Sequence, residues 1–78
     1  LVHSAQVDVT LPESTESIDV RITLVDDNGT EDEVYAATLA PDSSRNTTVT
    51  IESTLTGSHV CRVYLNNSFA YQQTITLE

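Results

Sequence analysis

Lysine, methionine and tryptophan are absent from this 78-residue chain, and cysteine occurs once, at Cys61. A single cysteine excludes an intramolecular disulfide, which is the usual cross-link of small secreted domains. With two glycines in total, the chain has no glycine-rich phosphate-binding loop. A chain of this length forms one domain that buries only about 60–65% of its unfolded surface. We therefore expect a low free energy of unfolding, which binding of a partner chain or a metal would increase.

Positive charge is scarce, because twelve acidic residues face three arginines and the formal net charge is −9. Nucleic acid and anionic membranes repel such a chain, since both carry negative phosphates. The lack of lysine beside abundant Asp, Glu and Thr is typical of halophilic proteins, whose self-repulsion is screened by salt. An ordinary acidic secreted domain is the alternative.

No apolar run approaches the ~20 residues that a helix needs to span a bilayer, so we expect no membrane span. No signal peptide is visible at the start of the sequence. If the protein is exported, we therefore expect this sequence to be its mature form or an excised ectodomain.

Apolar and polar residues alternate along most of the chain with a period of two, which is typical of half-buried β-strands. The alternating segments are residues 1–11, 18–24, 33–40, 47–52, 59–65 and 69–77. Turn-forming residues separate them, notably at 28–29, 41–44 and 66–68. We predict an all-β fold, a small antiparallel sandwich or barrel of about six to seven short strands.

Residues 47–65 carry the clearest strand signal. Val49 and Ile51 share one face, and a second alternating segment follows the turn former Gly57. This pattern predicts an antiparallel hairpin with its turn at residues 55–58. In the last strand, the alternation predicts that Phe69 and Tyr71 share a face.

Several segments follow one another in a recognisable order: Asp-Asp-Asn-Gly-Thr at 26–30, Leu-Ala-Pro at 39–41, a Ser/Thr-rich strand at 47–51, and Thr56-Gly57 before alternating apolar residues. This order resembles immunoglobulin-like modules of archaeal, particularly halophilic, cell-surface proteins. The resemblance implies an extracellular immunoglobulin-like β-sandwich, in a family that spans adhesins, surface layers and filament subunits. His59 departs from the pattern, which often has an aromatic residue there. The lack of a long apolar N-terminal helix weighs against archaeal type IV pilins.

Three Asn-x-Ser/Thr sequons start at Asn28, Asn46 and Asn66, each in or beside a predicted turn. An exposed Asn in such a motif accepts an N-linked glycan in exported proteins. Because Ser and Thr are abundant, sequons also arise by chance. We predict that at least one of the three carries a glycan.

Acidic residues crowd the turn at 26–33, and Asp26, Asp27 and Asp32 are candidate calcium ligands because Ca²⁺ prefers carboxylate oxygens. The spacing is not that of an EF-hand loop, and a solvated acidic hairpin tip is the simpler interpretation. His59 and Cys61 share a strand face, but two ligands do not make a zinc site. A buried thiol beside a hydrogen-bonded histidine accounts for them.

The four aromatic residues are the one hint of a binding surface, as a sugar-stacking platform, and core packing is the alternative. They are Tyr35, Tyr64, Phe69 and Tyr71. No nucleophile motif contains the Ser, His or Asp residues. We expect no enzymatic activity and no cofactor.

Three regions follow from these patterns: an N-terminal strand at 1–12, a polar connector at 13–17 and a sandwich core at 18–78. Six strands are one short of the seven-stranded immunoglobulin sandwich, which leaves an edge for a partner. We therefore predict a structural subunit of an extracellular, pilus-like filament or surface assembly. In this homo-polymer the N-terminal strand is added to a neighbour's sheet through Ala5, Val7, Val9 and Leu11. The alternative is a monomeric glycan- or protein-binding module of a larger cell-surface protein.

Overall fold

The computed structural model describes residues 1–13, 15–40 and 46–78. Its strands are β1 (His3–Thr10), β2 (Ile18–Val25), β3 (Glu31–Leu39), β4 (Asn46–Ser53), β5 (Gly57–Leu65) and β6 (Ser68–Leu77). Within the described residues, no helix is long and apolar enough to cross a membrane. The turn predicted at residues 41–44 and Ser14 of the predicted connector lie outside the described residues.

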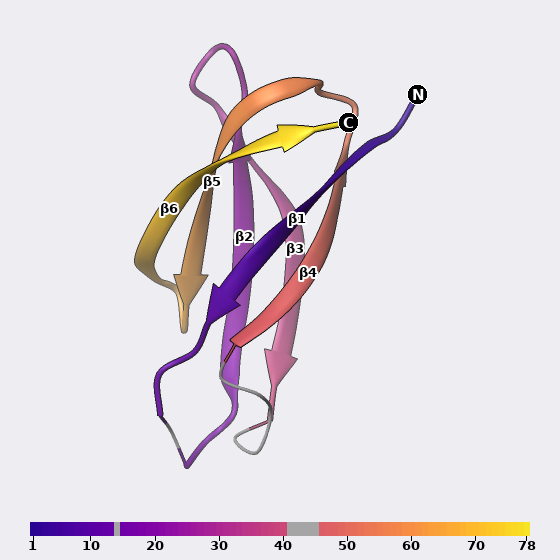
Figure 1. The fold of residues 1–78 in the computed structure, drawn as a ribbon. Helices are drawn as coiled ribbons and strands as arrows, with labels where there is room; N and C mark the ends of the chain where they lie inside the picture. Colours follow the sequence, from indigo (N-terminus) through magenta and orange to yellow (C-terminus); the bar gives the residue numbers. More distant parts are fainter. Residues whose placement is uncertain (14, 41–45) are drawn as a thin grey trace.

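The strands form two antiparallel sheets, one of four strands in the order β3-β2-β5-β6 and one of two strands, β1-β4. Figure 1 shows β1 and β4 lying across the larger sheet. Apolar side chains from both sheets form one core, made of Val7, Val9, Leu11, Ile18, Val20, Ile22, Leu24, Ile51, Cys61, Val63, Ile75 and Leu77. The predicted all-β antiparallel fold is confirmed, with six strands in two sheets among the described residues.

Two of the predicted turns make hairpins, β2–β3 and β5–β6. In the first, Gly29 has a φ of +82°, which a residue without a Cβ adopts readily. In the second, Asn66 and Asn67 have φ values of +50° and +65°. Two consecutive left-handed residues are the signature of a two-residue type I′ turn, whose twist matches that of the flanking strands.

The hairpin predicted within residues 47–65 is wrong. β4 pairs with β1, whereas β5 pairs with β2 and β6, so residues 54–56 carry the chain from one sheet to the other. Alternation indicates which side of a strand is buried, but not which strand lies beside it. Ile51 in β4 and Cys61 in β5 are both buried, although the two strands belong to different sheets. The resulting alternation of buried and exposed residues is the same as that of a hairpin.

A β-bulge in β3 settles which face of that strand meets the core. Ile22 pairs with Tyr35 and Thr23 pairs with Glu33, so Val34 is the extra residue. Because Ile22 points inward, Tyr35 points inward with it and packs against the core. Glu33, on the other side of the bulge, lies on the outer face.

A second bulge, in β6, changes the position of an aromatic residue. Val63 pairs with Tyr71 and Tyr64 pairs with Phe69, so Ala70 is the extra residue. The bulge reverses the alternation, and Phe69 lies on the outer face beside Tyr64. The expectation that Phe69 and Tyr71 share a face is therefore wrong, since strict alternation cannot anticipate an inserted residue.

The two sheets meet where the chain begins and ends. The Ser4 N–H donates to the Glu78 carbonyl (3.1 Å), and the Glu78 N–H donates to the Ser4 carbonyl (3.0 Å). Both termini accordingly lie at the same end of the molecule (Figure 1). This backbone pair links β1 to the end of β6.

Candidate functional site

The N-terminal strand lies between β4 and β6, in an arrangement that we call the β1 seat. Val7, Val9 and Leu11 are 0%, 1% and 4% exposed, and Ala5 packs at the margin of the same core. Eight residues of β1 pair with β4, with Val7 opposite Val49. The contact residues predicted from the sequence are thus brought together on one buried face, and in this structure they fill the core of their own chain.

The second edge of β1 is covered by side chains of β6. The Tyr71 hydroxyl accepts a hydrogen bond from the Thr10 N–H (3.0 Å) and donates one to the Asp8 carbonyl (3.0 Å). The Gln73 amide also donates to the Asp8 carbonyl (3.2 Å). These bonds satisfy backbone groups that an open edge would present to other chains. Tyr71 is therefore part of the β1 seat and not of a sugar-binding platform.

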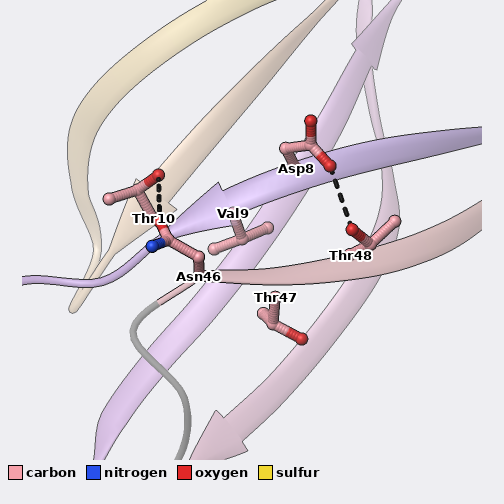
Figure 2. Close-up of a pocket in the computed structure, with 6 residues that line it drawn as sticks. All are labelled: Asp8, Val9, Thr10, Asn46, Thr47 and Thr48. Carbon is pink, nitrogen blue, oxygen red and sulfur yellow. Dashed lines mark hydrogen bonds between the residues drawn. The ribbon is translucent and has the colours of Figure 1, made fainter.

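Polar side chains fasten β1 to β4 on the solvent side (Figure 2). The Thr48 hydroxyl donates to Asp8 Oδ1 (3.0 Å), and the Thr10 hydroxyl donates to Asn46 Oδ1 (3.2 Å). These residues border a hollow of about 400 Å³ that Val9 and Thr47 complete. Among these six lining residues, Asp8 is the one with a titratable side chain.

In the acidic turn between β2 and β3, the first carboxylate is hydrogen-bonded to the backbone of the same turn. Asp26 Oδ1 accepts hydrogen bonds from the N–H groups of Asn28 and Thr30, both at 2.9 Å. Asp27 Oδ1 lies 3.9 Å from His59 Nδ1, and Asp32 is exposed on β3. Across the described residues, no three His, Cys, Asp or Glu side chains gather closely enough to hold a metal ion.

The three sequon asparagines are all exposed. Asn28 lies in the β2–β3 turn, Asn46 begins β4, and Asn66 lies in the β5–β6 turn. The Asn66 side-chain oxygen accepts a hydrogen bond from the Asp19 N–H (3.0 Å), and the Asn66 N–H donates to the Asp19 carbonyl (2.8 Å). Exposure at turns is what glycan attachment requires, and occupancy of these sequons stays a prediction.

His59 and Cys61 both point into the core, as their shared face predicted. His59 is 8% exposed, and its ring has Nδ1 3.1 Å from the Val25 carbonyl oxygen and Nε2 2.9 Å from the Thr56 carbonyl oxygen. The interpretation of His59 as a hydrogen-bonded structural residue is therefore confirmed. Burial raises the pKa of the Cys61 thiol, which keeps it protonated and poorly nucleophilic.

The outer face of the four-stranded sheet carries a network that centres on the Glu31 carboxylate. We call this group the outer-face cluster, and its members are Arg21, Thr23, Glu31, Glu33, Arg62, Tyr64, Phe69 and Gln72. Glu31 accepts hydrogen bonds from Tyr64 (2.7 Å), Thr23 (2.7 Å) and Arg62 (2.8 Å). Sequence reasoning missed this network, because its members are neighbours only in the register of β2, β3, β5 and β6.

Aromatic and cationic groups of the cluster stack on one another. The Arg21 guanidinium carbon lies 4.6 Å from the centre of the Tyr64 ring, and the Tyr64 and Phe69 rings meet edge to face at 5.8 Å. Arg62 also donates to the Gln72 side-chain oxygen (3.3 Å). The four aromatic residues thus divide, with Tyr35 and Tyr71 packed against the core and Tyr64 and Phe69 on the outer face.

The hydrogen bond between Tyr64 and Glu31 shifts the pKa of both groups. The pKa of Glu31 is lowered from its ordinary 4.5, first by Tyr64 and then by Thr23, and the pKa of Tyr64 is raised from 10.0 by the Glu31 carboxylate. A lowered carboxyl pKa in the folded state stabilises the fold above the unfolded pKa, near 4.5. That contribution is lost as the pH falls through the lower folded pKa.

Replacing Tyr64 with Phe is expected to raise the pKa of Glu31 part of the way back to 4.5, because it removes the strongest of the lowering hydrogen bonds. The ring remains to pack against Arg21 and Phe69. A pH titration of the Glu31 carboxyl carbon by NMR measures the change. Tyr71→Phe is the matched control, because its hydroxyl bonds β1 and should leave Glu31 unaffected. An unchanged Glu31 titration in Tyr64→Phe would contradict the hydrogen-bond assignment.

Comparison with known protein families, with curated proteins and with solved structures finds no match to this chain.

Proposed function

We propose that this chain is a non-enzymatic structural subunit of an extracellular filament or surface assembly, in which copies exchange the N-terminal strand. The observation that carries the proposal is the β1 seat. β1 and the residue that follows it supply Val7, Val9 and Leu11 to the core, and residues 12–17 form the covalent link from this segment to β2. A second copy can present the same strand to the same seat.

Exchange keeps the contacts of the seat unchanged and alters only the path of the connector. Six extended residues span at most about 22 Å, which allows the link to leave one small domain and enter an adjacent one. Because the buried surface is the same in both forms, the balance depends on connector strain and on protein concentration. Exchange in which each copy donates to the next builds an open chain, and reciprocal exchange between two copies closes a dimer.

The surface composition supports an extracellular setting. The net charge of −9 keeps unassembled copies apart in dilute salt, and salt weakens this repulsion. Three exposed sequon asparagines suit a glycosylated surface protein. The archaeal and halophilic character implied by the resemblance of residues 18–77 is part of the same proposal.

A cysteine pair across β1 and β4 reports whether the seat is filled by the same chain or by a neighbour. Gln6 and Thr50 are opposite each other and exposed. Since Ser4 and Asp8 direct their backbone groups toward β6, Gln6 belongs to the alternating set that does not hydrogen-bond to β4. Cα atoms in such a pair are about 4.5 Å apart, within the range that a disulfide spans.

The Gln6→Cys/Thr50→Cys chain, concentrated and oxidised, is expected to give a ladder of covalent oligomers on a non-reducing denaturing gel, and a single monomer band after reduction. Cys61 is fully buried and does not compete for the disulfide. Gln6→Cys alone is the control and should stop at dimers. A double-cysteine chain that stays monomeric with a quantitative internal disulfide at every concentration would overturn strand exchange.

A further inference from the structure

We infer that the cleft between β5 and β6 on the outer face binds a neutral saccharide ring. The cleft has a volume of about 310 Å³ and is lined by Arg62, Tyr64, Phe69 and Gln72. This volume is at the lower end of the range for small-molecule sites, which suits one or two sugar rings. The lining combines an aromatic surface with a few convergent polar groups, and these are the two components that orient a small ligand.

Phe69 provides the apolar surface of this site. Its side chain is on the outer face because of the bulge at Ala70, and the residue is 54% exposed. The Phe69 ring makes one edge-to-face contact with Tyr64, and the Arg21 guanidinium lies over Tyr64 in turn. An aromatic side chain has only two χ angles, so it loses little conformational entropy when a ligand covers it. The C–H face of a sugar ring can therefore stack on Phe69.

Arg62 and Gln72 provide hydrogen-bonding groups beside that ring. Arg62 is held by Glu31 at 2.8 Å and by the Gln72 side-chain oxygen at 3.3 Å. A guanidinium has five N–H donors, and these two bonds occupy two of them. The Gln72 amide adds donors of its own. Sugar hydroxyls, which donate and accept, can match these groups at the edge of the stacked ring.

Charge selects a neutral ligand over an ionic one. Arg21 and Arg62 cancel Glu31 and Glu33, so the outer-face cluster is neutral within a chain of net charge −9. An anionic ligand is repelled by the surrounding field. A cation finds the Glu31 carboxylate already bonded to Tyr64, Thr23 and Arg62. The site does not include the β1 seat, so the inference stands or falls independently of strand exchange.

NMR titration of the ¹⁵N-labelled full chain with maltotriose, cellotriose and mannotriose tests the inference. With at least one of these neutral trisaccharides, we expect saturable shifts centred on residues 62–72, with a Kd on the order of 1 mM. Phe69→Ala is expected to weaken binding at least about tenfold, whereas Phe69→Trp should retain it. Thr74→Ala, on the outer face of the same strand but away from the cleft, is the matched control and should bind normally.

Two results would overturn the site as described. One is the absence of saturable shifts with all three trisaccharides up to about 20 mM, well above the expected Kd. The other is binding that persists unchanged in Phe69→Ala. Trigalacturonate serves as the charged probe, and binding as tight as that of the neutral sugars would overturn the selection by charge.

Discussion

A chain that lacks residues 1–12 is expected to be largely unfolded, and a synthetic peptide of those twelve residues is expected to restore the fold. The deletion removes Val7, Val9 and Leu11 from the core. Burying each of these side chains contributes about 1.5–3 kcal/mol. The net stability of small domains is roughly 0.05–0.15 kcal/mol per residue, so the loss is comparable to the whole. Circular dichroism and amide NMR dispersion measure the loss and the rescue.

The peptide makes this experiment a test of the β1 seat. The added strand has no connector, so refolding shows that the seat accepts β1 in trans, as strand exchange requires. A peptide carrying Val7→Asp is the matched control, because a charge at a fully buried position should abolish rescue. A truncated chain that keeps a cooperative thermal transition would contradict the role of β1 in the core. Equal rescue by both peptides would contradict specific seating.

Ile22→Ala is expected to lower the free energy of unfolding by about 2–5 kcal/mol, the usual cost of truncating a buried isoleucine. Ile22 is 0% exposed at the middle of β2, which pairs with β3 on one side and β5 on the other. The surrounding strands cannot easily collapse into the cavity that the truncation leaves. Urea denaturation followed by circular dichroism measures the change.

Two further variants calibrate the Ile22 measurement. Ile22→Val should cost only about 0.5–1.5 kcal/mol, because it removes a single methyl group. Thr50→Ala, at an exposed position of β4, should stay within about 0.5 kcal/mol of the parent chain. If Ile22→Ala lowers the free energy of unfolding by less than about 1 kcal/mol, the result would contradict a central position of Ile22 in the core.

Alternation was informative about burial because each strand has one face on a single core. It correctly predicted that Val7, Val9 and Leu11 share the buried face of β1, and that His59 and Cys61 share a face of β5. Turn chemistry located the β2–β3 and β5–β6 hairpins, since Gly29 and the pair Asn66–Asn67 adopt the left-handed backbone that those turns need.

Pairing between strands could not be derived in the same way. The β4–β5 connection joins two sheets. The period-two pattern is the same whether two consecutive strands pair in a hairpin or belong to different sheets. The bulges occur at Val34 and Ala70, which are not Gly, Asn or Asp and so give no sign of an irregular backbone in the sequence. The outer-face cluster depends on the register that these bulges set, and for that reason Glu31 and Phe69 were not recognised as partners of Tyr64.

The backbone pair between Ser4 and Glu78 determines how the domain responds to mechanical tension. Because Ser4 and Glu78 are paired at the end of the molecule where both termini lie, a force that separates the two termini opens this pair first. The load then reaches two terminal ladders, β1–β4 at the His3–Ser53 rung and β5–β6 at the Gly57–Leu77 rung. Tension between the ends therefore acts directly on both terminal strands, and one of them, β1, is the strand we propose to pass from copy to copy.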